Sequence, residues 1–138
     1  MPAQNRNKPV ASSPSSRISE LGIVLPASPT PLGAYVESSD TGNLLFLSGT
    51  LPVVNRKLAI SGRLGENLSV KEGQEAARIA SLNALAAAKQ HLGSLDRLKK
   101  LVKLTSLFES DIKIFEFGLF NDLNSTRQLL NRIQIFLN

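Results

Sequence analysis

The order of apolar and polar residues along the chain predicts one domain in which short strands accompany a long helix. Residues 44–47 form a continuous apolar run between the turn signals Thr41-Gly42-Asn43 and Ser48-Gly49, which is typical of a strand covered on both faces. Further strands are expected at 58–60 and 98–104, and a short extended piece at 34–37. Three prolines and Gly33 mark residues 26–33 as a loop.

The clearest predicted element is a helix over residues 70–92. Ser69-Val70-Lys71-Glu72 has the capping-box pattern, in which the serine oxygen and the glutamate satisfy backbone N–H groups of the first turn. Gly93 follows the last helical residue and can take the left-handed conformation that ends a helix. The apolar face consists largely of alanine, which permits a close approach to a sheet: Ala76, Ala77, Ile79, Ala80, Ala84, Ala87 and Ala88.

Composition divides the chain into three stretches. Residues 1–17 are rich in proline and serine and lack acidic residues, so we expect a disordered tail, and Pro2, Pro9 and Pro14 oppose a helix there. Residues 18–105 have the make-up of an ordinary domain. Residues 106–138 hold five of the six phenylalanines and no valine, proline or alanine, and within them a helix is predicted from the cap at 124–126 through Ile133.

Overall composition limits the classes of function. The chain has 138 residues, no cysteine and one histidine, which excludes disulfides, thiol catalysis and a multi-histidine zinc site. It has no run of 18 apolar residues that would span a membrane. The net charge of +5 permits an anionic ligand without requiring one. These features predict a cytoplasmic globular protein.

Few single residues point to chemistry. His91 lies in the last turn of the predicted helix, where its charged form suits the helix dipole, and a structural role is the favoured interpretation. Ser48 and Gly49 end a strand, where a hydroxyl and a close backbone approach can serve a ligand or simply make a turn. No G-x-S-x-G elbow surrounds Ser48, which argues against a hydrolase triad. Tyr35 is the sole tyrosine and is compatible with either a core or a site position.

An ordered set of short motifs resembles the YjgF/RidA family of reactive intermediate deaminases, and within it the branch called endoribonuclease L-PSP/chorismate mutase-like. The resemblance runs from residue 18 to residue 105. The motifs that carry it are Gly33-Ala34-Tyr35, Gly42-Asn43-Leu44-Leu45-Phe46-Leu47-Ser48-Gly49, Leu64-Gly65-Glu66-Asn67-Leu68-Ser69, Glu75-Ala76-Ala77, Leu82-Asn83-Ala84-Leu85-Ala86-Ala87 and Gly93-Ser94-Leu95-Asp96.

This resemblance implies an α+β, chorismate mutase-like fold with a mixed β-sheet and helices packed on one face. It also implies homotrimers with small-molecule clefts between subunits, and cofactor-free hydrolysis of enamines and imines to keto acids and ammonia. By position in the motifs, Tyr35, Ser48 and Gly49 correspond to substrate-binding residues of the cleft. Some relatives are credited with RNA cleavage, although the lysines 99, 100 and 103 lack the interleaved aromatic residues that stack bases.

The C-terminal stretch departs from the family pattern. Deaminases of the family grip the substrate carboxylate with an arginine on a late strand and position water with a late glutamate, and neither motif is visible after Thr105. Arg127 and Arg132 stand in a helix-like context instead. We therefore expect the last family strands to be missing, through truncation or a frameshift, and the deaminase activity to be impaired. The catalytic residues are not identified by the sequence, and an RNA-binding endoribonuclease or a non-catalytic metabolite-binding protein are the alternatives.

Overall fold

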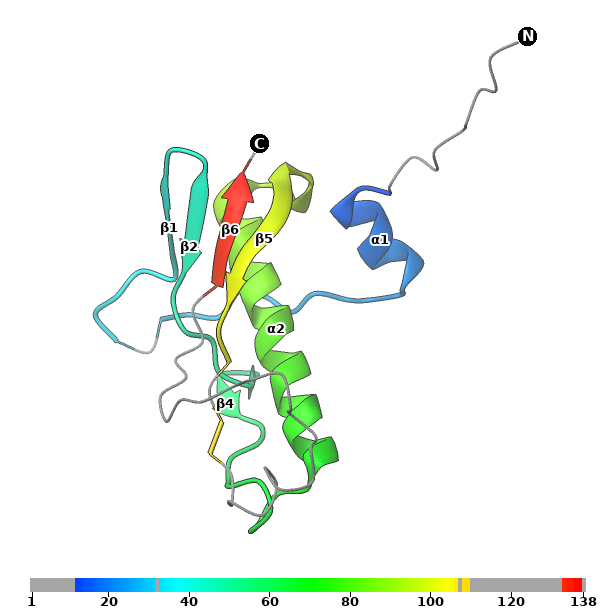
Figure 1. Ribbon diagram of the computed structural model, residues 1–138, viewed down its shortest axis with the longest axis vertical. Coiled ribbons are helices and arrows are strands. Elements are labelled where there is room, and N and C mark those ends of the chain that lie inside the picture. Colours follow the sequence, from blue (N-terminus) through cyan, green and yellow to red (C-terminus); the bar gives the residue numbers. More distant parts are fainter. Residues whose placement is uncertain (1–11, 32, 107, 110–132, 138) are drawn as a thin grey trace, which may run out of the picture.

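The computed structural model describes residues 12–31, 33–106, 108–109 and 133–137, and it combines one long helix with an antiparallel sheet (Figure 1). Along the chain the elements are α1 (Pro14–Glu20), β1 (Ser38–Thr41), β2 (Leu44–Leu47), β3 (Val53–Val54), β4 (Lys57–Leu58), α2 (Val70–Leu92), the 3-10 turn η1 (Leu95–Arg97), β5 (Leu98–Leu104) and β6 (Ile133–Leu137). The predicted α+β class is confirmed.

The main sheet has the strand order β1-β2-β6-β5, and every neighbouring pair runs antiparallel. Among the described strands this differs from the mixed sheet that the resemblance implies. The predicted strand at 44–47 is confirmed as β2, where Leu45 and Leu47 are buried and the alternate positions are half-buried. One face of β2 therefore carries the core, rather than both faces equally.

Helix α2 lies across the sheet (Figure 1), and the alanine face of its C-terminal half packs against β2. The buried cluster contains Leu45, Leu47, Ala84, Ala87, Ala88, Leu92 and Leu95. Alanine side chains are short, so the helix comes close to the sheet and the leucines of β2 fill the space between them. The contact between the alanine face and the sheet that the sequence predicted is thus present.

Both ends of α2 are formed as the sequence predicts. The Ser69 hydroxyl accepts from the Glu72 backbone N–H at 3.3 Å, and the Glu72 carboxylate accepts from the Ser69 backbone N–H at 2.7 Å. These bonds, the backbone one first, hold the pKa of the Glu72 carboxyl below its usual value. At the other end Gly93 has a φ of +79°, a conformation that a residue with a Cβ rarely adopts.

The predicted disordered tail is wrong for its last residues, because residues 14–17 belong to helix α1. Ser13 caps this helix, and Pro14 occupies its first turn, where the missing N–H is not needed by the helix. The backbone N–H of Ser15 donates to the Asp96 carboxylate at 2.8 Å, which ties α1 to the turn after α2. Proline opposes a helix in its interior, and the start of a helix is the exception.

A small hairpin, β3 and β4, stands apart from the main sheet beside α2 (Figure 1). The expected strand at 58–60 is displaced, since pairing stops at Leu58 and joins only Val53–Leu58 and Val54–Lys57. The extended piece expected at 34–37 is not a strand either; β1 begins after it, at Ser38. Beyond the hairpin, an isolated bridge between Leu64 and Leu68 leads the chain to the cap of α2.

The C-terminal stretch supplies a central strand that the sequence did not predict. β6 lies between β2 and β5 and pairs with both, in the stretch where the last family strands were expected to be missing. Ile133, expected to lie in a helix, begins this strand. The rest of that predicted helix, with Arg127 and Arg132, lies outside the described residues. The spacing of Leu129, Leu130 and Ile133 in the sequence suits a helix, and at Ile133 the pairing with two distant strands decides for β structure.

Candidate functional site

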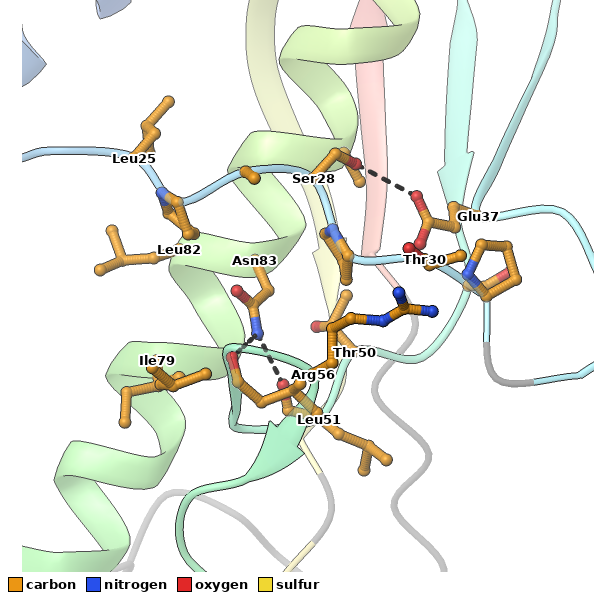
Figure 2. Close-up of a pocket in the computed structure, with 18 of the residues that line it drawn as sticks. Leu25, Ser28, Thr30, Glu37, Thr50, Leu51, Arg56, Ile79, Leu82 and Asn83 are labelled. Atoms are coloured by element: carbon orange, nitrogen blue, oxygen red, sulfur yellow. Dashed lines mark hydrogen bonds between the residues drawn. The ribbon is translucent and has the colours of Figure 1, made fainter.

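A pocket of about 920 Å³ lies between α2, the β3–β4 hairpin and an extended N-terminal strap, residues 24–31 (Figure 2). The prolines of the strap limit its backbone to extended conformations, and Leu25 anchors it by packing on the core. Besides the strap, the lining consists of Tyr35, Glu37, residues 48–51 and 53–56, Arg78, Ile79, Leu82, Asn83 and Ala87. Such a volume accommodates a small metabolite.

The three residues singled out by the sequence, Tyr35, Ser48 and Gly49, all line this pocket. Ser48 is fixed by two bonds: its hydroxyl donates to the Val36 carbonyl, and its backbone N–H donates to the Glu37 carbonyl at 2.9 Å. Because the hydroxyl proton is engaged, the oxygen of Ser48 has lone pairs to offer a ligand N–H or O–H. The structure thus brings the sequence candidates together at one end of β2.

Glu37 is a pocket residue that the sequence analysis did not single out. It is half-buried, and the Ser28 hydroxyl donates to its Oε2 at 3.1 Å, which links the strap to the segment before β1 (Figure 2). A carboxylate held in this way can accept a proton from water or from a ligand. No local pattern marked it, because residues 34–37 are not a strand in which alternate side chains share one side.

Two arginines also line the pocket, and both escaped the sequence analysis. Arg78 on α2 makes a two-point pair with Glu75, with Nε–Oε2 and Nη2–Oε1 distances of 2.8 Å, and this pairing raises the pKa of Arg78 and lowers that of Glu75. Arg56 lies in the hairpin turn, and its guanidinium points toward Thr30 and Glu37 in Figure 2. Among the described residues, no carboxylate lies within 4.0 Å of Arg56.

Asn83 builds the wall of the pocket. It is only 3% exposed, and its side-chain amide donates to the Leu51 and Val53 carbonyls, both at 2.9 Å (Figure 2). These bonds join the middle of α2 to the start of the hairpin. The sequence did contain a signal, since Asn83 is a polar residue between apolar neighbours on the alanine-rich face, and a buried amide requires partners.

His91 lies away from the pocket, between the end of α2 and strand β1. Its Nδ1 is 2.9 Å from the Ser38 hydroxyl, and its Nε2 is 2.9 Å from Asp40 Oδ1. Serine, histidine and aspartate thus occur in contact, but on an edge strand and with more than half of the Asp40 side chain exposed. The arrangement tethers the helix end to β1, in agreement with the structural role that the sequence favoured for His91.

In the described part of the chain, no three His, Asp or Glu side chains lie close enough together to hold a metal ion. None of the helices described combines the length and apolar character that a bilayer crossing requires.

Comparison with known proteins gives one match to a family and several to individual proteins. Residues 15–134 match the family described as "YjgF/chorismate mutase-like, putative endoribonuclease". The match passes Thr105, where the motif-based resemblance ends. A relative from Trypanosoma cruzi, Protein TCP17, is 39% identical over 95 residues, which are 69% of this chain and 59% of that protein. The chain therefore spans about three fifths of the length of this relative.

Two solved structures share the fold. A putative endoribonuclease from Shewanella oneidensis is 28% identical with a TM-score of 0.72, over 92% of this chain and 99% of that one. The protein Atu1372 from Agrobacterium tumefaciens, described as of unknown function, is 24% identical with a TM-score of 0.61, over 89% and 91% of the two chains, and shows the fold alone. Because the family match covers most of its length, this chain belongs to the YjgF/chorismate mutase-like family.

Proposed function

We propose that the pocket binds a small carboxylate-bearing metabolite and hydrolyses reactive imines of that class to keto acids and ammonia. The observation that carries the proposal is the convergence of Tyr35, Glu37, Ser48 and Gly49 on one pocket of about 920 Å³. These four residues supply hydroxyl, carboxylate and backbone groups around a space of metabolite size. This is the chemistry that the family resemblance implies, and it calls for no metal or organic cofactor.

The proposed reaction adds water across the C=N bond. Glu37 accepts a proton from the attacking water while the oxygen bonds to the imine carbon, and the imine nitrogen takes a proton from solvent. Glu37 then returns its proton to the nitrogen of the amino alcohol, ammonia leaves as the C–N bond breaks, and the hydroxyl releases its proton to solvent to leave the carbonyl. Tyr35 and Ser48 orient the ligand and the water, and the backbone N–H of Gly49 steadies the charge that develops on oxygen.

A homotrimer is part of this proposal. Exposed apolar side chains on β5 support subunit contacts, since Leu101, Val102 and Leu104 are 54%, 48% and 55% exposed. The family resemblance implies that the pocket would then lie beside a neighbouring subunit. Light scattering or sedimentation equilibrium tests this point, and a monomer over the working concentration range contradicts it.

The test of the activity is release of pyruvate from 2-aminoacrylate generated in the assay. We expect turnover above the spontaneous rate, yet about ten- to a hundredfold below that of a family member with the late-strand arginine, which corresponds to one charge-assisted hydrogen bond. Glu37→Gln is expected to remove the acceleration, while Glu20→Gln on α1, far from the pocket lining, leaves it unchanged. Full activity in Glu37→Gln would contradict the role of Glu37.

RNA cleavage is the second candidate, because the matched family and the Shewanella protein are both described as putative endoribonucleases. In this chain the exposed lysines 99, 100 and 103 on β5 give it limited support. Saturable binding of a single-stranded RNA that weakens steeply with salt, together with cleavage by the purified protein, would favour it. A third alternative, metabolite binding without catalysis, predicts a ligand-dependent rise in Tm with no turnover.

A further inference from the structure

In the hairpin turn between β3 and β4, an arginine has the positive φ that glycine usually adopts. Asn55 and Arg56 are its two central residues, with φ values of +51° and +65°. Two-residue turns with positive φ at both positions favour Asn-Gly, because glycine has no Cβ to strain. Asparagine stands where the turn prefers it, and arginine stands where glycine is expected. A strained residue of this kind is a signal of function when the surrounding structure enforces it.

Contacts on both sides of the turn enforce the conformation of Arg56. The Asn83 amide holds the Leu51 and Val53 carbonyls at 2.9 Å, so the hairpin is fixed to α2 on one side. On the other side the chain is paired through Val53–Leu58 and Val54–Lys57. The turn is therefore constrained, and the Arg56 side chain is directed over the pocket, toward Thr30 and Glu37 (Figure 2).

The charges around the pocket leave Arg56 available for an anion. Arg78 is engaged by Glu75, and Glu37 is engaged by Ser28. Within the part of the chain that the structure describes, Arg56 has no ion-pair partner within 4.0 Å. It is exposed at the rim, so an incoming ligand meets its guanidinium before reaching the pocket floor.

We propose that Arg56 is the residue of this pocket that binds the carboxylate of the ligand, and that this role accounts for an arginine at a strained turn position. A guanidinium matches the two oxygens of a carboxylate through parallel N–H···O bonds, and at the exposed rim Arg56 replaces only part of the contact that the late-strand arginine makes in the family's deaminases. The ligand class is a small monoanionic carboxylate, because the Glu37 carboxylate on the same pocket repels a doubly charged phosphate more strongly. The inference rests on the proposed function for the imine chemistry, but carboxylate binding can be measured without turnover.

The experiment titrates sodium pyruvate into the full-length protein at constant ionic strength and measures the Kd by calorimetry. Three variants are compared with the unmodified chain: Arg56→Gly relieves the turn and removes the charge, Arg56→Gln keeps the strain and removes the charge, and Lys57→Gln removes the adjacent charge outside the pocket lining. Methyl pyruvate, which lacks the charge, and inorganic phosphate serve as comparison ligands.

We expect both Arg56 variants to bind pyruvate about tenfold more weakly, the size expected for a partly exposed charge-assisted bond, and Lys57→Gln to bind it normally. Methyl pyruvate binding should not depend on Arg56. Arg56→Gly should also raise the Tm by a few degrees, since glycine relieves the strained turn, and Arg56→Gln should not. Weaker binding in a more stable protein is an outcome that a purely structural arginine does not produce.

Unchanged pyruvate affinity in Arg56→Gln, or an equal loss in Lys57→Gln, would overturn the inference. Phosphate binding that is tighter than pyruvate binding and depends on Arg56 would overturn the carboxylate assignment. Arg56-dependent pyruvate binding in a protein that does not accelerate 2-aminoacrylate hydrolysis supports the inference and contradicts the proposed function, so the two failures are distinguishable.

Discussion

The C-terminal part and the middle of helix α2 make contacts of different kinds. The C-terminal part presents Ala84, Ala87 and Ala88 to leucines of β2 and η1, and this contact is apolar throughout. The middle of the helix presents Asn83 to the hairpin through hydrogen bonds, and Arg78, Ile79 and Leu82 to the pocket. Close packing of the alanines leaves no space between the helix and the sheet. The longer Asn83 side chain bonds to two carbonyls of the hairpin and keeps the hairpin backbone at a distance from the helix, which leaves room for a ligand.

The largest effect is expected where the apolar contact is broken. Leu45 is completely buried, so Leu45→Ala removes the branched end of the side chain and leaves a cavity against α2, with an expected loss of about 2–5 kcal/mol in the free energy of unfolding. Urea unfolding followed by circular dichroism measures it. As a control, Val36→Ala truncates a side chain that is 68% exposed and should change stability by less than about 0.5 kcal/mol. Equal effects of the two substitutions would refute the assignment of β2 to the core.

A smaller loss, with a local consequence, is expected on the polar side of the helix. Asn83→Ala leaves the Leu51 and Val53 carbonyls without their donor, which should lower the free energy of unfolding by about 1–3 kcal/mol. Amide hydrogen exchange should accelerate in the hairpin and remain slow in β2. Ser81→Ala, on the exposed side of α2, is the matched control, since its hydroxyl only donates to the Ala77 carbonyl of its own helix. Uniform acceleration across the sheet in Asn83→Ala would show that the two contacts are not separable.

The N-cap of α2 stabilises the whole helix. Its loss should therefore weaken the alanine contact with β2 and the Asn83 contact with the hairpin equally. Ser69→Ala removes the side-chain half of the capping box and is expected to cost about 1 kcal/mol in stability. Ser69→Thr keeps a hydroxyl that can accept from the Glu72 backbone N–H and donate to the Glu72 carboxylate, and it should recover most of that loss. A Ser69→Ala variant as stable as the unmodified protein would show that the cap does not contribute.

The smallest effect concerns α1, at the edge of the molecule, and depends on pH. The pKa of Asp96 is lowered from its ordinary 3.8, first by the bond from the Ser15 backbone N–H. A lowered pKa in the folded state stabilises the fold at pH values above 3.8, and this contribution is lost as the pH falls through the folded-state pKa. In Asp96→Asn the part of the acid-induced loss due to this group should disappear. The check is hydrogen exchange in α1 between pH 5 and pH 2.5, and an unchanged pH profile in the variant would contradict the role of Asp96.

The parts of the fold that the sequence predicted are those whose signals lie close together in the chain. The cap at Ser69, the alanine face and the glycine after Leu92 lie close together in sequence, so they predicted α2 with its observed bounds. The turn-flanked apolar run predicted β2 in the same way. Among the pocket residues, Tyr35, Ser48 and Gly49 were found through the family resemblance, and no local pattern pointed to Arg56.

What the sequence determined by itself is a helix with both of its ends and one core strand, because propensity, capping and periodicity act over a few residues. The α+β fold followed from the resemblance of its motifs to a known family. The tertiary structure decided the rest. It inserted β6 between β2 and β5, placed a helix over Pro14, and brought Arg56, Glu37 and Asn83 around one pocket. These outcomes depend on pairing and packing between segments that are far apart in the chain, and a local pattern carries no information about which distant segment will be its neighbour.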